Sequence, residues 1–347
     1  MTAHALSLKQ PTQPIPSSAH GDLFEAVQEA VHRRADFALP DQVVEASDLH
    51  ATDQGDVEVP NLGVLSLTDW SVRQLGTIVG VRWAKWFSDD LVAPDEKAEE
   101  LNRRFARITD RFRIRARRYT PEESGTEDGV LRAFVGPGYA PTDDREVFDR
   151  LGRTLGSRVS ELQFVRASVT ESSSQFAAVS SESVDLGTLI PDGHKNGFLI
   201  ANSEVGARAL TIQVFVERLI CTNGLVVADS RLLHWIHRVR RVNDFESRLR
   251  GALALLPEKW QRGIRLLQAA RGTLVAEPEE HIRSVLAADP VTRKHVEAVV
   301  TAFAAEPEAT LFAVVQAMTR AARGLTPEDR LALEEFAGRH LAGSAPP

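Results

Sequence analysis

The chain has 347 residues, of which 43% are hydrophobic and 26% charged, and its formal net charge is −7 at pH 7. This composition is typical of a globular protein with room for two or three domains, and the negative charge excludes a uniformly basic nucleic-acid binder. The single cysteine, Cys221, excludes an internal disulfide framework and a Cys-x-x-Cys metal site. The sequence has no run of eighteen apolar residues and no apolar signal-peptide core, so we expect a cytoplasmic protein that does not enter the membrane.

The N-terminal part of the chain is predicted to be mostly helical. Residues 1–20 carry three prolines and no apolar periodicity, which indicates a flexible tail. Helical spacing of apolar residues follows at 23–35, at 68–88 with Thr68 as N-cap, and at 95–111. Residues 41–61 are acidic and irregular. We expect these helices to belong to a core domain that spans residues 21–245.

The apolar period changes from helical to alternating at residue 112. In the strand 112–119 apolar side chains alternate with Arg113, Arg115 and Arg117, so one face of the strand is lined with arginine. About seven strands are expected between residues 112 and 228, joined mostly by short turns. The prediction is an α+β fold with a largely antiparallel central sheet, N-terminal helices and a C-terminal helical lobe.

The chain becomes helical again after residue 229. Pro257, Pro290, Pro307 and Pro327 each stand where a helix could begin, because the first turn of a helix tolerates a missing N–H. We expect five or six helices in this part and a C-terminal helical region over residues 246–347. The pattern allows these helices either to pack on the sheet or to form a separate lobe.

The segment 197–227 contains two predicted hairpins. Alternation from Leu210 to Ile220 indicates a half-buried strand, and Asn223-Gly224 predicts a type I′ turn at its end. Arg218 falls among the apolar positions of this strand, where a charge must find a partner or reach water.

The same segment carries a family resemblance. Asn202-Ser-Glu-Val-Gly206 before the strand and Cys221-Thr-Asn-Gly224 at its end resemble the phage- and plasmid-associated family known as domain of unknown function 932. The resemblance covers roughly residues 60–245 and leaves the tail and the last helices outside. It implies a task in DNA maintenance, recombination or host defence on mobile elements, and it implies no catalytic residue.

The arginines supply the leading functional hypothesis. Eight arginines fall within residues 103–118, and a second group lies within residues 231–250. Clustered guanidinium groups on a sheet with flanking helices favour phosphate contacts, so we expect a protein that binds nucleic acid, single-stranded DNA in particular, without catalysis. The predicted contact residues are Arg113, Arg115, Arg117, Arg231, Arg238, Arg240 and Arg241.

Two alternatives stay open. An enzyme could gather Asn202, Glu204, Arg218 and Asn223 in a ligand pocket at the ends of adjacent strands, although the same residues also suit hairpin turns. A self-assembling protein could instead use the C-terminal helices for contacts between copies. The sequence has no phosphate-binding loop, zinc-protease motif or hydrolase elbow, and we expect neither a cofactor nor a metal site.

Overall fold

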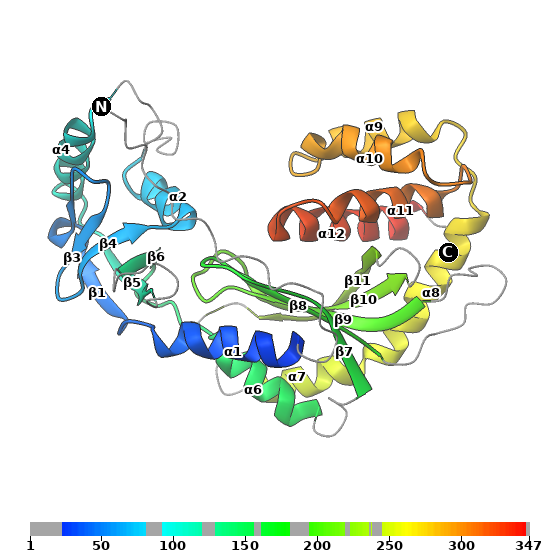
Figure 1. Cartoon of the computed structure of the whole chain (residues 1–347), viewed down its shortest axis with the longest axis horizontal. Coiled ribbons are helices and arrows are strands. Elements are labelled where there is room, and N and C mark those ends of the chain that lie inside the picture. Colours follow the sequence, from blue (N-terminus) through cyan, green and yellow to red (C-terminus); the bar gives the residue numbers. More distant parts are fainter. Residues whose placement is uncertain are drawn as a thin grey trace.

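The computed structural model describes residues 23–80, 92–119, 129–155, 161–180, 194–218, 223–235, 237 and 245–344. The fold is α+β, as predicted from the sequence, but its strands form two sheets rather than one. In Figure 1 the sheet nearer the N-terminus lies beside α2 and α4, the second sheet lies at the centre, and helices α9 to α12 stack above its far end.

The N-terminal sheet has six strands in the order β1-β5-β6-β4-β3-β2, and β4 runs parallel to β6. Its strands are β1 (Gln42–Glu45), β2 (His50–Ala51), β3 (Val57–Val59), β4 (Gly63–Leu67), β5 (Arg111–Arg118) and β6 (Gly129–Val135). Four of them come from the segment before residue 68, so the expectation of an irregular region at 41–61 was wrong. These strands are only two to five residues long, too short for an alternating pattern to stand out.

One face of the N-terminal sheet is covered by helices. Helix α2 (Asp69–Ile78) begins at the predicted N-cap Thr68, whose hydroxyl accepts a hydrogen bond from the Ser71 N–H, and α4 (Pro94–Phe105) follows. Leu75, Leu101 and Phe105 of these helices join the core that also holds Leu65 and Ile114. The second half of the helix expected at 68–88 lies outside the described residues.

The central sheet is antiparallel and has the order β11-β10-β9-β8-β7. Its strands are β7 (Leu162–Val169), β8 (Ser174–Ser180), β9 (His194–Asn202), β10 (Leu210–Arg218) and β11 (Asn223–Trp235). Asn223 pairs with Arg218 and Gly224 with Glu217, so both residues of the predicted Asn-Gly turn belong to the strand. The prediction of a turn at Asn223-Gly224 was therefore wrong. Cys221 lies outside the described residues.

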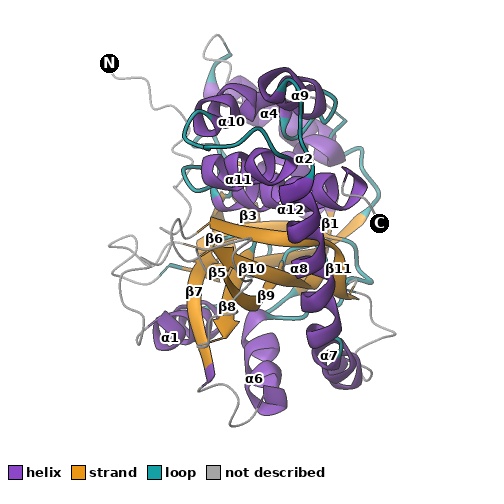
Figure 2. Ribbon diagram, turned by 90° about the vertical axis from the view of Figure 1, so that its right-hand side faces the viewer, coloured by secondary structure: helices purple, strands orange, loops and turns teal. Residues whose placement is uncertain are grey.

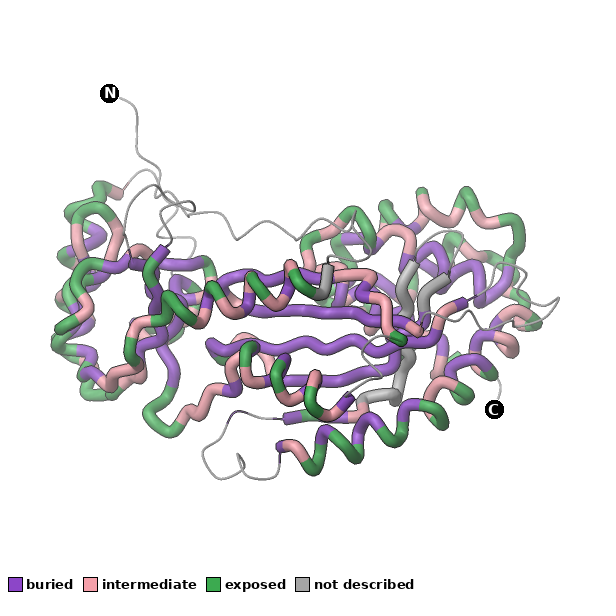
Figure 3. Tube along the Cα trace, turned by 60° about the horizontal axis from the view of Figure 1, so that its bottom comes forward, coloured by how far each residue is buried: buried purple, intermediate pink, exposed green. Residues whose placement is uncertain are grey.

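Helices cover both faces of the central sheet. Helices α1 (Leu23–Asp36), α6 (Asp144–Leu155) and α7 (Phe245–Ala254) lie below it in Figure 1, whereas α11 (Leu311–Ala322) and α12 (Pro327–Ser344) lie above it. Phe176 and Phe198 face the lower layer, and Phe215 on the opposite face packs in one cluster with Leu331 of α12. Figure 3 shows the resulting buried strands between partly exposed helices. The described strands of the central sheet therefore present no open face for binding a polymer.

The C-terminal helices share the main core. Helices α8 (Leu256–Gly272), α9 (Pro278–Ala287) and α10 (Val296–Phe303) complete this region, with α9 and α10 stacked over α11 and α12 in both Figures 1 and 2. A single apolar cluster runs from Val27 of α1 through the central sheet to Leu341 of α12. The core thus crosses the domain boundary expected at residue 245, and the helices pack on the sheet. Among the described helices, none has the length and apolar character that a bilayer span requires.

Candidate functional site

A cluster of charges, most of them buried, joins the two sheets. We call it the junction cluster, and its members are Arg34, Asp41, Arg115, Arg117, Arg132, Asp143, Asp144, Glu171 and Glu204. They come from α1, the residue before β1, β5, β6, the start of α6 and the turns that follow β7 and β9, and only Asp41 and Asp143 among them are partly exposed. Because ionised groups are rarely buried without partners, so many together must be held by mutual hydrogen bonds.

Glu204 stands at the centre of the cluster. Its carboxylate accepts a hydrogen bond from Arg132 Nη1 at 2.7 Å and lies 3.1 Å from Arg34 Nη2. The backbone N–H of Asp144 donates to the other carboxylate oxygen at 2.9 Å. Burial alone would raise the pKa of Glu204, but the guanidinium groups of Arg34 and Arg132 hold that pKa far below its usual value. Glu204 is therefore a fixed anion and a poor general base.

Two further arginines tie β5 to the loops of the central region. Arg117 donates through Nε to Glu171 at 3.0 Å, and Arg115 bridges Asp41 at 3.0 Å and Asp143 at 2.7 Å. Burial would raise the pKa of Glu171, but Arg117 and Arg132 lower it overall. Asp143 behaves in the opposite way, because burial and the charge of Glu204 together raise its pKa against the effect of Arg115.

The predicted arginine face of β5 is therefore buried rather than exposed. Arg115 is 8% and Arg117 2% exposed, and both are engaged with carboxylates, while Arg113 is partly exposed and donates to the carbonyl of Pro137. The alternation of the strand was read correctly, but its polar face meets carboxylates from distant segments instead of solvent. Arg115 and Arg117 are not placed to contact phosphate.

The loop after β9 docks the N-terminal sheet onto the central sheet. Ser203 Oγ accepts from the N–H of Ala207 at 2.9 Å, and the carbonyl of Val205 accepts from Trp70 Nε1 at 3.0 Å. Gly206 adopts a φ of +79°, a conformation that suits glycine, and an added Cβ there would touch the ring of Tyr139. Each residue of Asn202-Ser-Glu-Val-Gly206 thus has a structural task at the junction, with Asn202 Nδ2 donating to Asp144 Oδ1 at 2.7 Å.

The strand-end pocket expected from the sequence does not form as predicted. Asn202 and Glu204 meet through Asp144, at one end of β9. Arg218 pairs with His194 at the other end of β9, and Asn223 pairs with Arg218. A nine-residue strand separates the two ends by roughly 27 Å, because each strand residue advances about 3.4 Å. The four residues therefore divide into two distant pairs.

His237 lies against the junction cluster and stays neutral. Its Nδ1 accepts a hydrogen bond from the Thr142 N–H at 3.2 Å, and its ring packs on that of Tyr139 at 5.4 Å. Burial lowers the pKa of His237 to about 4. His234, near the end of β11, is exposed, whereas His237 is buried.

A second group of charged residues lies on α6 and α7. We call it the arginine surface; its members Arg153, Arg248 and Arg250 are exposed, and its member Arg150 is partly exposed. The pKa of Glu246 is lowered first by its hydrogen bond from Arg250 and then by the charges of Arg153 and Arg150, so the two helices place these groups close together. Arg248 is exposed on the same helix and lies over the ring of Trp235 at 5.5 Å.

The arginine surface includes Arg248 and Arg250 from the second arginine group of the sequence. Helix α7 begins at Phe245, shortly after Arg238, Arg240 and Arg241, which lie outside the described residues. Arg231 belongs to β11, where it pairs with Gln213. The sequence reasoning missed Arg150 and Arg153, whose signal was two arginines three residues apart in the segment that forms α6.

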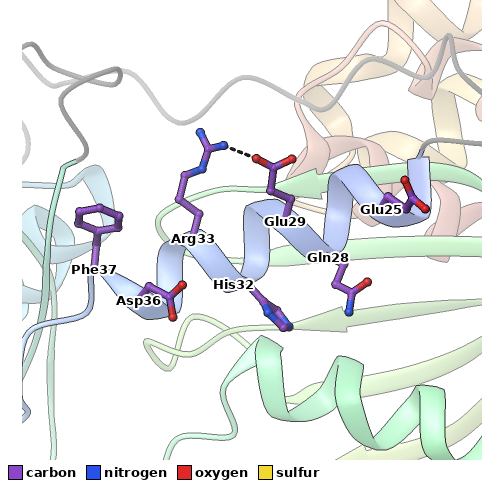
Figure 4. Close-up of a pocket in the computed structure, with 7 residues that line it drawn as sticks. All are labelled: Glu25, Gln28, Glu29, His32, Arg33, Asp36 and Phe37. Carbon is purple, nitrogen blue, oxygen red and sulfur yellow. Dashed lines mark hydrogen bonds and ion pairs between the residues drawn. The ribbon is translucent and has the colours of Figure 1, made fainter.

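A shallow groove along α1 has a different character. It is lined by Glu25, Gln28, Glu29, His32, Arg33, Asp36 and Phe37. Figure 4 shows these side chains projecting from α1, with Arg33 paired to Glu29. Because its carboxylates outnumber its single arginine, this groove is unsuited to a phosphate backbone. None of the residues predicted as a site from the sequence lines it.

Comparison with known proteins adds one finding. A family model described as a domain of unknown function, DUF932, matches residues 132–324, which is more than half of the chain. The chain belongs to the DUF932 family. The match begins within β6 and includes helices α7 to α11, so the DUF932 domain extends further toward the C-terminus than the likeness expected at residues 60–245. No curated protein and no solved structure matches the chain.

Proposed function

We propose that this DUF932 protein binds nucleic acid, single-stranded DNA in particular, through the arginine surface of α6 and α7. The observation that carries the proposal is that Arg150, Arg153 and Arg250, from two neighbouring helices, all lie close enough to Glu246 to lower its pKa. Arg150 and Arg250 also form ion pairs with Glu146 and Glu246. Exposed guanidinium groups from two neighbouring helices provide contacts to phosphate oxygens without reading base sequence.

Two members of the arginine surface are the best placed to contact phosphate groups. Arg153 and Arg248 are exposed, and neither forms an ion pair with a carboxylate of the described part of the chain. The nearby residues 238–241 add three more arginines to the same stretch of sequence. A flexible single strand can follow such a surface, because its backbone bends without the cost of deforming a duplex.

Base stacking has little part in this proposal. Tyr119, Phe134 and Phe198, three aromatic residues in or next to the strands, are at most 9% exposed and belong to the interior. Phe112 and Phe134 contact each other edge to face within the N-terminal core. Binding through phosphate contacts alone is expected to be tolerant of sequence and sensitive to salt.

Charge reversal on the arginine surface tests the proposal. We expect the double variant Arg153→Glu, Arg248→Glu to bind a fluorescent single-stranded oligonucleotide at least about ten-fold more weakly than the wild type in low salt, measured by anisotropy. The matched control is Arg103→Glu, Arg107→Glu, which makes the same change of charge at exposed positions at the end of α4. Equal weakening by both double variants, or none by the first, would count against a specific site on α6 and α7.

Location and assembly form the remaining part of the proposal. A nucleic-acid-binding protein of a family carried by phages and plasmids is expected to act in the cytoplasm, where its ligand is. Self-association through the C-terminal helices would multiply the number of arginine surfaces on one strand and raise avidity. Mass photometry with and without DNA measures whether oligomers form.

A further inference from the structure

Two histidines face each other in the C-terminal helices. His281 lies in α9 and His340 in α12, and their Nε2 atoms are 2.9 Å apart. The ring centroids are 5.0 Å apart and the ring planes are tilted by 45°. Both side chains are partly exposed, so the pair is reachable from solvent. This pair lies outside both the junction cluster and the arginine surface.

The spacing of the two nitrogens suits a shared metal ion. Imidazole nitrogens bind zinc at about 2.0–2.1 Å, and tetrahedral geometry then separates two such nitrogens by roughly 3.3 Å. The pair needs to open by only a few tenths of an ångström to reach that separation. Imidazole is a good ligand for zinc, nickel and copper ions and a poor one for magnesium, which prefers oxygen.

Neighbouring side chains contact the ring of His340. The ring stacks on that of Phe336 at 6.3 Å with an interplanar angle of 8°, and its Nδ1 lies 3.5 Å from Ser344 Oγ. These contacts fix the ring so that Nε2 points at His281, as outer partners do in metal sites.

We propose that His281 and His340 form a two-histidine site for a divalent transition-metal ion such as Zn²⁺ or Ni²⁺. Within the described part of the chain no group of three or more potential metal-ligating side chains comes together, so water completes the coordination. The ion would tie α9 to α12, two helices that are distant in sequence. Its open positions would also accept a ligand atom from outside the chain.

Calorimetric titration of tag-free, chelator-treated protein with ZnCl₂ and NiCl₂ tests the site. We expect about one equivalent to bind to the wild type, and we expect His281→Gln and His340→Gln each to weaken that binding by at least about ten-fold. The matched control is His50→Gln, because His50 is exposed in β2, and it should bind as the wild type does. MgCl₂ should produce no binding at this site.

Folding is checked separately from binding. Circular dichroism and melting of each metal-free variant establish that it is folded, and either single variant suffices if the other fails. A wild type that binds no Zn²⁺ or Ni²⁺, folded His281 and His340 variants that bind like the wild type, or equal binding of Mg²⁺ would each overturn the proposal. The hydrogen bond between the two rings would then be their whole role.

Discussion

At the scale of single residues, Glu204 decides how the junction cluster is held. Its two carboxylate oxygens accept hydrogen bonds from Arg132 and from the backbone N–H of Asp144 and form an ion pair with Arg34, and its side chain is 5% exposed. A buried ion pair contributes little net stability compared with an apolar pair of the same shape, but removing one partner leaves a buried charge uncompensated. The cluster therefore specifies how the two sheets dock more than it strengthens the fold.

Replacing Glu204 by glutamine removes this central charge and keeps the shape of the side chain. We expect the free energy of unfolding to fall by about 3 kcal/mol or more, because Arg34 and Arg132 lose their shared anion. Urea denaturation followed by circular dichroism measures the loss. The control is Glu297→Gln, which breaks the exposed pair with Arg283 and should change stability little. A Glu204 variant as stable as the control would contradict the structural role of the cluster.

Protonation of His237 should appear in the dependence of stability on pH. Its pKa is about 4 in the folded protein and 6.5 in the unfolded chain, so between these values the unfolded state binds more protons. The contribution of His237 to stability is therefore fully present above pH 6.5. It declines as the pH falls toward 4, by at most about 1.4 kcal/mol per pH unit.

Substitution separates His237 from other groups that titrate in the same window. His237→Gln keeps an acceptor for the Thr142 N–H, and we expect its stability to decline less steeply than that of the wild type between pH 6.5 and 4. Thermal melts in a series of buffers measure the difference. The prediction fails if the wild type and the variant show parallel pH profiles. Some decline is expected in both proteins, because the pKa of His340 is also lowered to about 4.

At the scale of elements, Gly197 is the position where a substitution tests the close packing of the central sheet. A Cβ there would collide with the carbonyl oxygen of Ala178 and come within 2.8 Å of Val179. The Gly197 carbonyl also accepts a hydrogen bond from Trp260 Nε1 at 2.7 Å, which fixes α8 to the sheet.

Gly197→Ala is therefore expected to destabilise the protein by about 1–3 kcal/mol, since β8 and β9 would have to move apart. The matched control is Gly251→Ala in the exposed face of α7, where an added Cβ meets nothing within 4 Å. Alanine favours helix by about 0.5–1 kcal/mol over glycine, so the control should gain stability. Differential scanning calorimetry of both variants decides the matter, and a stabilised Gly197 variant would show that the strands are not packed as described.

The sequence predicted the elements better than their environments. Alternation identified β5 and β10 and placed Arg113, Arg115 and Arg117 on one face, because side-chain direction in a strand depends only on local geometry. It could not show that Glu171 and Asp143 would cover that face, since those contacts join residues 28 to 54 positions apart. Arg132 within the apolar strand Gly129–Val135 was the one local signal of a buried charge network.

The candidate sites show the same limit. Asn202 and Glu204 were singled out from their motif and do meet, but the register of β9 with β10 carries Arg218 to the opposite end. The Asn223-Gly224 pair has the composition of a hairpin turn, yet the pairing with Arg218 and Glu217 draws both residues into the strand. Register and bulges depend on the packing of whole strands, and no short motif records them.

At the scale of the whole molecule, helices cover both faces of the central sheet in the described part of the chain. The central sheet lies between α1, α6 and α7 on one side and α11 and α12 on the other (Figures 1 and 3), and the polar face of β5 is closed by the junction cluster. We propose that contacts with a large anionic partner come from the exposed helices of the described part of the chain. The exposed arginines of α6 and α7 meet this requirement.

The salt dependence of binding to single-stranded DNA tests this central claim most directly. The logarithm of the binding constant is measured by anisotropy against the logarithm of salt concentration, for the wild type and for the Arg153→Ala, Arg248→Ala variant. We predict low-salt binding by the wild type and a slope that flattens by about 0.7 for each lost phosphate contact, or roughly 1.4 for the double variant, with an unchanged melting temperature. A wild type that does not bind in low salt, or a folded variant with the wild-type slope, would contradict binding through α6 and α7.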